Sequence, residues 1–348
     1  MASIEFSRGF TRMNADLKGM LPVDAVVVDG RPGLWWMDMS GVSLAQPFFQ
    51  QTVARAKTDR NRRELFTEFD VLLQLEKQLD SVPPTGFIFH SSRCGSTLVA
   101  NACRAINNSI VLSEANAIDK LIARFITDAG DIKTSLYSVF LRGVVNALAQ
   151  RRVGDEEYLF IKFACCSFAQ IEQIRRIWPN VPWLFLYRDP VETIVSNLKD
   201  VPPWLLDNDR RVLASIAGTS SGEVTGMPLE ELCARTIGSL FSTAHRLAND
   251  GELLLNYKQL TVPVISSVLR FFKVSPSTTE LETIEHGIQI YSKEPSGTRT
   301  FVADTDAKLQ LASDAVRAAA AKWATEPYRL LERKRLEQTN QVNNHECN

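Results

Sequence analysis

Short apolar runs recur between residues 86 and 257, and stretches with helical spacing of apolar residues separate them. Five of these runs have the length of buried strands and cover residues 86–89, 109–114, 158–162, 181–187 and 253–257. Apolar residues at helical spacing cover residues 98–106, 117–151, 167–177, 191–197, 229–249, 262–272 and 309–335. Strands that alternate with helices predict an α/β fold, in which a parallel sheet carries helices on both faces.

The N-terminal part of the chain has a different pattern. Two short apolar runs, residues 25–28 and 33–37, flank a turn-forming sequence and predict a pair of strands. Residues 47–79 have helical spacing, interrupted by a polar break at residues 60–63. We therefore expect an α+β extension ahead of the main sheet.

The change in pattern near residue 82 suggests a domain organisation. We expect an N-terminal extension over residues 1–82, a main domain over residues 83–336 and a polar tail over residues 337–348. The extension either packs on the main domain as an appendage or caps part of a substrate site. Residues 201–227 and 289–299 are rich in turn-forming residues and predict long loops.

The turn after the first strand of the main domain reads Ser91-Ser92-Arg93-Cys94-Gly95-Ser96-Thr97. Ser96 or Thr97 can cap the helix that follows, and Gly95 allows close approach of the backbone to a ligand. The first N–H groups of such a helix attract anions, which predicts an anion-binding turn. It is not a nucleotide triphosphate loop of the form GxxxxGK[ST], because no lysine follows Gly95 and the cation, Arg93, precedes it. The alternative is an ordinary turn between a strand and a helix.

A second group of polar residues follows the strand at residues 181–187. Arg188-Asp189-Pro190 stands where a helix begins, and Ser196 comes about two helical turns later. A guanidinium fork and a hydroxyl suit the oxygens of a phosphate monoester. The alternative is that Arg188 forms an ion pair with Asp189 or a glutamate beside the helix cap.

Polar side chains stand at or just past the ends of several predicted strands. Glu114, Lys162 and Arg188 each follow such a strand, as does the turn at residues 91–97. The carboxyl ends of parallel strands meet at one edge of the sheet, and ligands bind there. The sequence therefore predicts that these groups converge on one site.

Composition restricts the class of protein. The chain has 348 residues, a net charge of −1, 45% hydrophobic residues and 23% charged residues, which is ordinary for a globular protein. Near-neutral charge gives no reason to expect nucleic acid as a partner, and no apolar run approaches the roughly 20 residues of a membrane span. The first residues lack the apolar core of a secretory signal, and the six cysteines include no C-x-x-C pair. We therefore expect reduced thiols and a cytoplasmic protein.

The paired motifs resemble those of the sulfotransferase superfamily, whose donor is 3′-phosphoadenosine-5′-phosphosulfate (PAPS). The resemblance covers residues 83–335 and implies a P-loop-type sheet. The turn around Gly95 is similar to the family's 5′-phosphosulfate loop, and Arg188 with Ser196 is similar to its 3′-phosphate element. The sequence Asn256-Tyr257-Lys258-Gln259-Leu260 resembles a strand end that reads Y-E-D-L in the family. The cofactor-binding residues implied are Ser92, Arg93, Cys94, Gly95, Ser96, Thr97, Arg188, Ser196, Tyr257, Lys293 and Arg299.

The arrangement is closest to the protein-tyrosine sulfotransferase type. The small-molecule enzymes of the family have a histidine two residues after a lysine, whereas Lys162 is followed by Phe163-Ala164. In the protein-tyrosine type, a glutamate after the next strand is the base, and Glu114 stands there. The catalytic residues that the resemblance implies are Glu114 as base, Lys162, Ser292 and Arg93. Cys94 departs from the family, which has a serine at that position.

The resemblance also implies the reaction. PAPS would give up its sulfuryl group by in-line transfer to a hydroxyl or amine, leaving 3′,5′-ADP, and no metal is required. The acceptor is a small molecule or a peptide of unknown identity, and the sequence does not predict an oligomeric state.

Several alternatives remain open at this stage. Glu114 could be a carboxylate at a helix N-terminus, Lys162 could extend from a strand end to solvent, and His90 is the reserve base. A P-loop kinase or NTPase would share the fold, although the missing lysine after Gly95 argues against it. The other alternative is a non-catalytic nucleotide-binding protein of the same fold.

Overall fold

The computed structural model describes Leu17 and residues 19–75, 79–127, 131–249, 251–288 and 309–346. The chain divides into two compact units that alternate along the sequence. Among the described residues, the first unit contains residues 17–87 and 100–181, and the second contains 88–99, 182–288 and 309–346. The predicted boundary at residues 82 and 83 stays a prediction.

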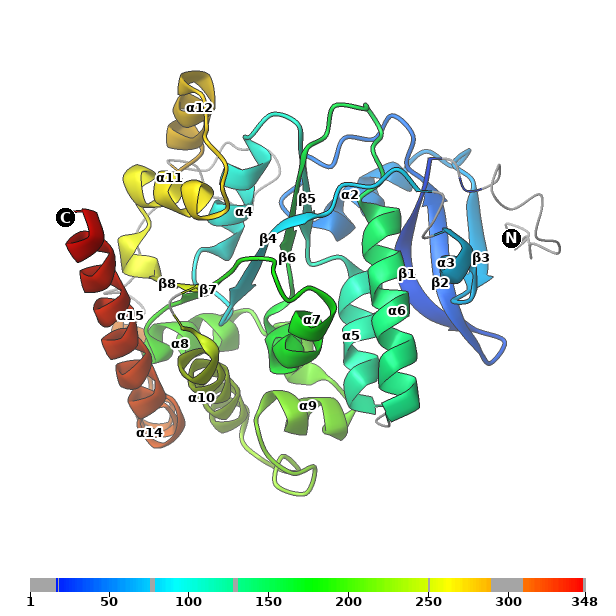
Figure 1. Cartoon of the computed structure of the whole chain (residues 1–348). Helices are drawn as coiled ribbons and strands as arrows, with labels where there is room; N and C mark the ends of the chain where they lie inside the picture. Colours follow the sequence, from blue (N-terminus) through cyan, green and yellow to red (C-terminus); the bar gives the residue numbers. More distant parts are fainter. Residues whose placement is uncertain are drawn as a thin grey trace. The chain divides into compact units, whose positions relative to one another are not determined.

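The main sheet has the expected α/β topology (Figure 1). Its five strands have the order β5-β6-β4-β7-β8, so the first of them in the chain is the central one. β5 is parallel to β6, and β7 is parallel to β8. Helices flank the sheet, and the strands are β4 (Pro84–His90), β5 (Ser109–Ser113), β6 (Tyr158–Lys162), β7 (Trp183–Tyr187) and β8 (Leu253–Asn256). The predicted fold class, a P-loop-type sheet flanked by helices with an α+β extension, is confirmed.

The N-terminal extension contains a small antiparallel sheet of order β1-β2-β3. β1 (Met20–Val28) and β2 (Arg31–Asp38) are the predicted strand pair, and Asp29 and Gly30 join them with φ of 49° and 76°. Positive φ at both turn residues matches the right-handed twist of a hairpin. α2 (Phe49–Ala56) and α3 (Val71–Leu75) are the helices of this region.

The helical prediction for residues 47–79 is wrong at β3 (Glu64–Glu68). This segment pairs with β2, with Phe66 opposite Trp35, and Trp36 Nε1 donates a 2.8 Å hydrogen bond to Thr67 Oγ1. Five residues are too short for their own spacing to decide between helix and strand, so the pairing with β2 decides.

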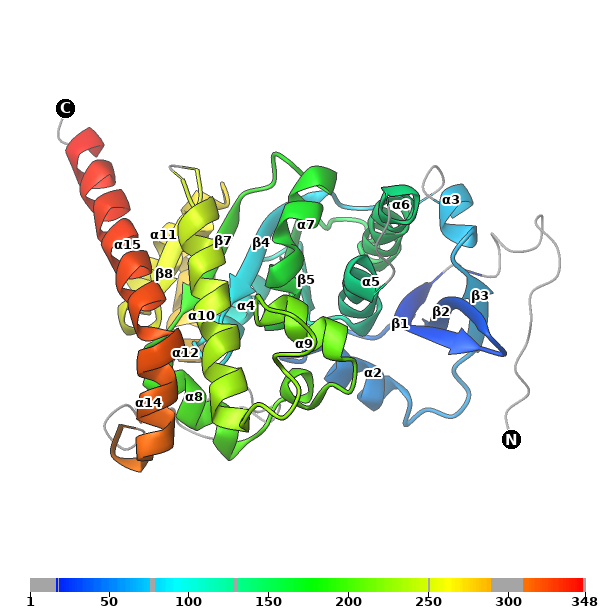
Figure 2. The same cartoon turned by 90° about the horizontal axis from the view of Figure 1, so that it is seen from below.

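Two of the remaining helices of the first unit, α5 and α6, pack against the extension. α5 packs against α6 and against β1, and both views show these elements side by side (Figure 2). The elements are α5 (Asn116–Thr127), α6 (Asp131–Leu148), the 3₁₀ helix η1 (Cys165–Gln170) and α7 (Ile171–Ile177). The helix α4 (Ser96–Arg104), which follows the turn after β4, begins in the second unit and ends in the first.

In the second unit, α10 packs against α8, α9, α14 and α15. The helices are α8 (Pro190–Lys199), η2 (Pro203–Leu206), α9 (Arg210–Ile216), α10 (Leu229–Leu247), η3 (Tyr257–Gln259), α11 (Val262–Phe271), α12 (Thr278–Ile288), α14 (Asp314–Trp323) and α15 (Thr325–Glu346). The predicted loop at residues 201–227 contains η2 and α9, and α15 continues into the predicted tail. The Gln338 side chain helps to hold this last part of α15 in place, because it donates hydrogen bonds to the carbonyls of Asn249 and Glu252.

No helix in the described part of the chain combines the length and apolar character needed to cross a bilayer.

Candidate functional site

The turn after β4 has an unusual backbone. Ser92 and Arg93 have φ of 72° and 49°, and Gly95 has φ of 85°. Two consecutive non-glycine residues in the left-handed region are uncommon, and each costs about 1 kcal/mol or more unless its surroundings hold it there. Leu98 and Val99 donate the first hydrogen bonds of α4, both to the carbonyl of Gly95. The amides of residues 95–97 therefore precede the helical ladder, as an anion-binding turn requires.

The turn is tied to the end of β7. The amide of Ser91 and the thiol of Cys94 both donate to the carbonyl oxygen of Leu186, at 3.0 and 3.1 Å. The amide of Ser92 donates to Nδ1 of the buried His90 at 3.1 Å. That ring nitrogen therefore supports the turn.

The Arg93 side chain lies along the C-terminal end of α8. Its Nε donates to Asn197 Oδ1 at 3.4 Å, and its Nη2 lies 2.7 Å from Asp200 Oδ2. Ser92 Oγ donates to the same Asn197 oxygen at 2.9 Å. Asn197 is fully buried, so it is a fixed support for both residues. Its role could not be read from the motif alone.

Arg188 is buried and already paired. Its guanidinium forms an ion pair with Glu192 one helical turn along, and both side chains are nearly inaccessible to solvent. Asp189 instead caps α8, since its carboxylate accepts hydrogen bonds from the amides of Val191 and Glu192. The guanidinium carbon also lies 4.2 Å from the centroid of the Tyr257 ring.

Tyr257 connects Arg188 with the turn after β4. A Cβ atom added at Gly95 would lie 3.0 Å from Tyr257 Cδ2 and 2.5 Å from Leu260 Cδ1. The described residues predicted to bind the two phosphates therefore belong to one unit, and the Tyr257 ring lies beside both Arg188 and Gly95. Ser196 lies half-buried on α8 in the same unit.

Glu114 and Lys162 form a second cluster, in the first unit. Lys162 Nζ makes an ion pair with Glu114 Oε1, and the amide of Glu114 donates to the carbonyl of Lys162 at 2.7 Å. The Lys162 side chain is 1% exposed and that of Glu114 is 31% exposed, so the lysine does not extend to solvent. Glu114 has φ of 52° and lies outside α5, in the left-handed region where strain often marks a functional residue.

Two residues that the sequence reasoning missed adjoin this pair. The Phe48 ring centroid lies 5.0 Å from Lys162 Nζ. Asp119 Oδ1 accepts hydrogen bonds from the amide of Ala164 at 3.1 Å and from Ser167 Oγ at 2.8 Å. Burial, followed by the negative charge of Glu114, raises the pKa of Asp119 to about 7. Neither residue belongs to a motif, so only the fold brings them to the pair.

Three predicted site residues, Ser292, Lys293 and Arg299, lie outside the described residues. Their roles stay predictions.

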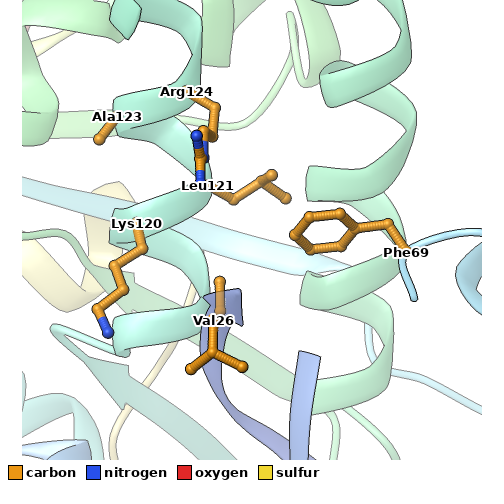
Figure 3. Close-up of a pocket in the computed structure, with 7 residues that line it drawn as sticks. Val26, Phe69, Lys120, Leu121, Ala123 and Arg124 are labelled. Carbon is orange, nitrogen blue, oxygen red and sulfur yellow. The ribbon is translucent and has the colours of Figure 1, made fainter. Parts of the chain in front are cut away.

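A small pocket of about 220 Å³ lies within the first unit (Figure 3). Apolar side chains of β1, α5 and Phe69 line it, with Lys120 and Arg124 at its polar side. Lys120 already makes a 2.7 Å ion pair with Asp24. No residue of the two clusters lines this pocket. Within the described ranges, no three His, Cys, Asp or Glu side chains are grouped so that they could hold a metal ion.

No family model matches the chain, and no curated protein matches it. Among solved structures, it is similar in fold to several sulfotransferase domains. The sulfotransferase domain of the Synechococcus PCC 7002 olefin synthase is 14% identical over 73% of this chain and 95% of that one, with a TM-score of 0.38. Sulfotransferase STF9 from Mycobacterium avium is 10% identical over 69% of this chain and 79% of that one, with a TM-score of 0.42. A sulfotransferase from Alicyclobacillus acidocaldarius is 14% identical over 71% of this chain and 99% of that one, with a TM-score of 0.38. Similarity at these identities and TM-scores does not indicate which reaction, if any, this chain catalyses.

Proposed function

We propose that the chain is a sulfotransferase that moves a sulfuryl group from PAPS to a hydroxyl or amine acceptor, with Glu114 as the general base. The observation that carries the proposal is the strained turn at Ser92 and Arg93, in the same unit as Arg188 and Tyr257. Strain of this kind clusters at ligand-binding sites, where the surrounding structure maintains it. The paired motifs of the sequence point to the same nucleotide.

The donor is assigned to residues of the second unit. The amides of residues 95–97 and the Arg93 guanidinium suit the 5′-phosphosulfate, and Arg188 with Ser196 suits the 3′-phosphate. Arg188 is already paired with Glu192. A guanidinium has five N–H donors, however, so one carboxylate does not exhaust it. Lys293 and Arg299, predicted from the resemblance, remain further candidates for this site.

The chemistry assigned to the first unit is proton removal and charge stabilisation. The acceptor atom forms a bond to sulfur while the bond between sulfur and the bridging phosphate oxygen breaks. The electron pair of the broken bond stays on the phosphate of 3′,5′-ADP, and the proton of the acceptor goes to Glu114. Protonation of Glu114 would weaken its ion pair with Lys162, and the ammonium would then stabilise charge on the leaving oxygen. Ser292 is proposed to assist from the late loop.

Transfer from labelled PAPS to a panel of phenols, alcohols, sugars, amines and tyrosine peptides tests this function. Glu114→Gln should lower the transfer rate by about 10²- to 10⁴-fold, the usual contribution of a general base, and leave the affinity for 3′,5′-ADP unchanged. Glu157→Gln is the matched control, because Glu157 is an exposed glutamate of the same unit.

Two outcomes would contradict the proposal. Stronger thermal stabilisation by Mg-ATP than by 3′,5′-ADP would indicate a phosphotransferase. Binding of 3′,5′-ADP without transfer to any acceptor would indicate a nucleotide-binding protein without catalytic activity.

A further inference from the structure

A buried polar network joins the C-terminal helix α15 to the ends of β7 and β8, all within the second unit (Figure 1). Glu332 on α15 accepts a hydrogen bond from the hydroxyl of Tyr187, the last residue of β7. The same carboxylate oxygen accepts from Asn256 Nδ2, on the last residue of β8, at 3.0 Å. Tyr187 and Asn256 are 0% and 2% exposed, so both donors are buried, while the Glu332 side chain is 24% exposed.

The two strand ends lead directly into the proposed donor site. Tyr187 is followed by Arg188, and Asn256 is followed by Tyr257. Asn256 is held at both ends of its amide, because Nδ2 donates to Glu332 while Oδ1 accepts from the amide of Lys258 at 3.0 Å. Its side chain therefore joins α15 to the 3₁₀ turn that carries Tyr257.

Aromatic packing reinforces the same connection. The ring of Tyr328 on α15 lies 6.0 Å from that of Tyr187 and 5.8 Å from that of Phe241, in edge-on or tilted arrangements. The Tyr328 hydroxyl also accepts from Asn256 Nδ2 at 3.0 Å. Such ring pairs add about 0.5–1.5 kcal/mol beyond the area that they bury.

The carboxylate of Glu332 is held in its ionised form. Burial opposes ionisation, but hydrogen bonds from Arg335, Tyr187 and Asn256 together keep its pKa below the usual value. Arg335, one turn along α15, forms a 3.0 Å ion pair with it. A charged acceptor shared by two strand ends makes stronger bonds than a neutral one.

We propose that Glu332 is a positioning residue of the donor site, which fixes through Tyr187 and Asn256 the two strand ends that carry Arg188 and Tyr257. The inference rests on the proposed function for the identity of the nucleotide. The inference adds to the proposed function that packing of α15 on the ends of β7 and β8 and affinity for the nucleotide are thermodynamically coupled. Coupling of this kind is reciprocal, so nucleotide binding also stabilises the docked helix.

Hydrogen exchange in the absence of ligand tests the positioning role first. Glu332→Ala should speed amide exchange over residues 256–260, which include the Lys258 amide bonded to Asn256. Lys334→Ala is the matched control, because Lys334 also anchors α15, through a 2.6 Å bond to the carbonyl of His245 on α10 and not to a strand end. Equal exchange over residues 256–260 in the two variants would overturn the inference. If the Glu332→Ala chain fails to fold, Glu332→Gln, which removes the charge of the shared acceptor, takes its place in the same comparison.

Calorimetry with 3′,5′-ADP then tests the coupling. Glu332→Ala should weaken binding by about five- to fifty-fold, within the usual range of coupling between sites, and Lys334→Ala by less than about twofold. Glu332→Gln, which keeps an acceptor oxygen but no charge, should fall between Glu332→Ala and the wild type. In the wild type, 3′,5′-ADP should slow exchange along α15.

Equal losses of affinity in Glu332→Ala and Lys334→Ala would refute the coupling. Absence of binding to the wild-type chain would refute the proposed donor, and the exchange measurement without ligand would still decide the positioning role.

Discussion

The ammonium nitrogen of Lys162 lies 5.0 Å from the centroid of the Phe48 ring, although Phe48 belongs to the N-terminal extension. Phe48 is the N-cap residue of α2. The segment before it is held in place, because Arg104 Nε and Arg152 Nη1 donate to the carbonyls of Leu44 and Val42 at 3.1 and 2.8 Å. The extension thus contributes a side chain to the Lys162–Glu114 cluster.

Replacing Phe48 should affect transfer more than nucleotide binding. Phe48→Leu keeps an apolar side chain but removes the aromatic face over the ammonium, an interaction worth about 0.5–2 kcal/mol. We expect the transfer rate to fall by about three- to thirty-fold, with the dissociation constant of 3′,5′-ADP unchanged. Phe69→Leu is the control, since Phe69 lies in the same region but stacks on Phe140 at 5.2 Å. An unchanged rate in Phe48→Leu would mean that Phe48 only fills space.

A methyl group at Gly95 should disable the turn after β4. Alanine at a φ of 85° is strained, and its Cβ would lie 2.5 Å from Leu260 Cδ1. We expect Gly95→Ala to weaken binding of 3′,5′-ADP at least about tenfold and to lower the free energy of unfolding by about 1–3 kcal/mol. Gly222→Ala is the matched control, because a Cβ there meets no atom within 4 Å. Tight binding by Gly95→Ala would show that the turn does not contact the nucleotide.

The Arg188–Glu192 pair makes a single substitution hard to interpret, and a double substitution resolves the difficulty. Arg188→Gln alone leaves the buried Glu192 carboxylate without its partner, and we expect it to destabilise the fold by about 3–5 kcal/mol. Arg188→Gln combined with Glu192→Gln removes both charges and should fold nearly as well as the wild type.

The double variant then reports on the 3′-phosphate. If Arg188 binds that group, the variant should lose about 1.5–3 kcal/mol of the preference for 3′,5′-ADP over 5′-AMP, measured by calorimetry with both nucleotides. A preference equal to that of the wild type would assign the Arg188–Glu192 pair to structure alone.

Asp119 should make stability depend on pH. The folded pKa of about 7 lies above the ordinary value of 3.8, so folding favours the protonated carboxyl. The stabilisation is complete below about pH 4 and is lost as pH rises through about 7. Asp119→Asn cannot ionise, so its stability should fall less between pH 4 and pH 8 than that of the wild type. Allowing for partial exposure, we expect a difference on the order of 2 kcal/mol, measured by urea unfolding at several pH values. Parallel pH profiles of the two proteins would contradict this expectation.

The sequence predicted the elements whose own residues determine them. The continuous apolar runs at β6 and β7 predict buried strands, and the turn-forming residues around Gly95 predict the start of α4. β3 was missed because pairing with β2 overrides the weak pattern of five residues. The end of α15 was missed because a polar helix can be held by a few contacts, such as those of Gln338, that no spacing reveals.

For the candidate site, the motifs point to residues but not to the partners that those residues have in the structure. The sequence allowed an ion pair of Arg188 with Asp189 or with a glutamate beside the helix cap, but it did not show that the partner would be Glu192 and that the pair would be buried. Phe48, Asn197 and Glu332 lie far along the chain from the residues that they support. Contacts of that kind depend on the fold as a whole, and a local pattern does not contain them.

The interleaving of the two units has a consequence for biosynthesis. A ribosome releases the turn at Ser92 and Arg93 well before Asn197, Tyr257 and Glu332 emerge. The contacts that Ser92 and Arg93 make with Asn197 and Asp200 are therefore missing from the nascent chain until α8 has emerged. A polypeptide that stopped before α15 would contain both predicted phosphate motifs but lack Glu332, so we expect it to bind the nucleotide more weakly than the full chain does.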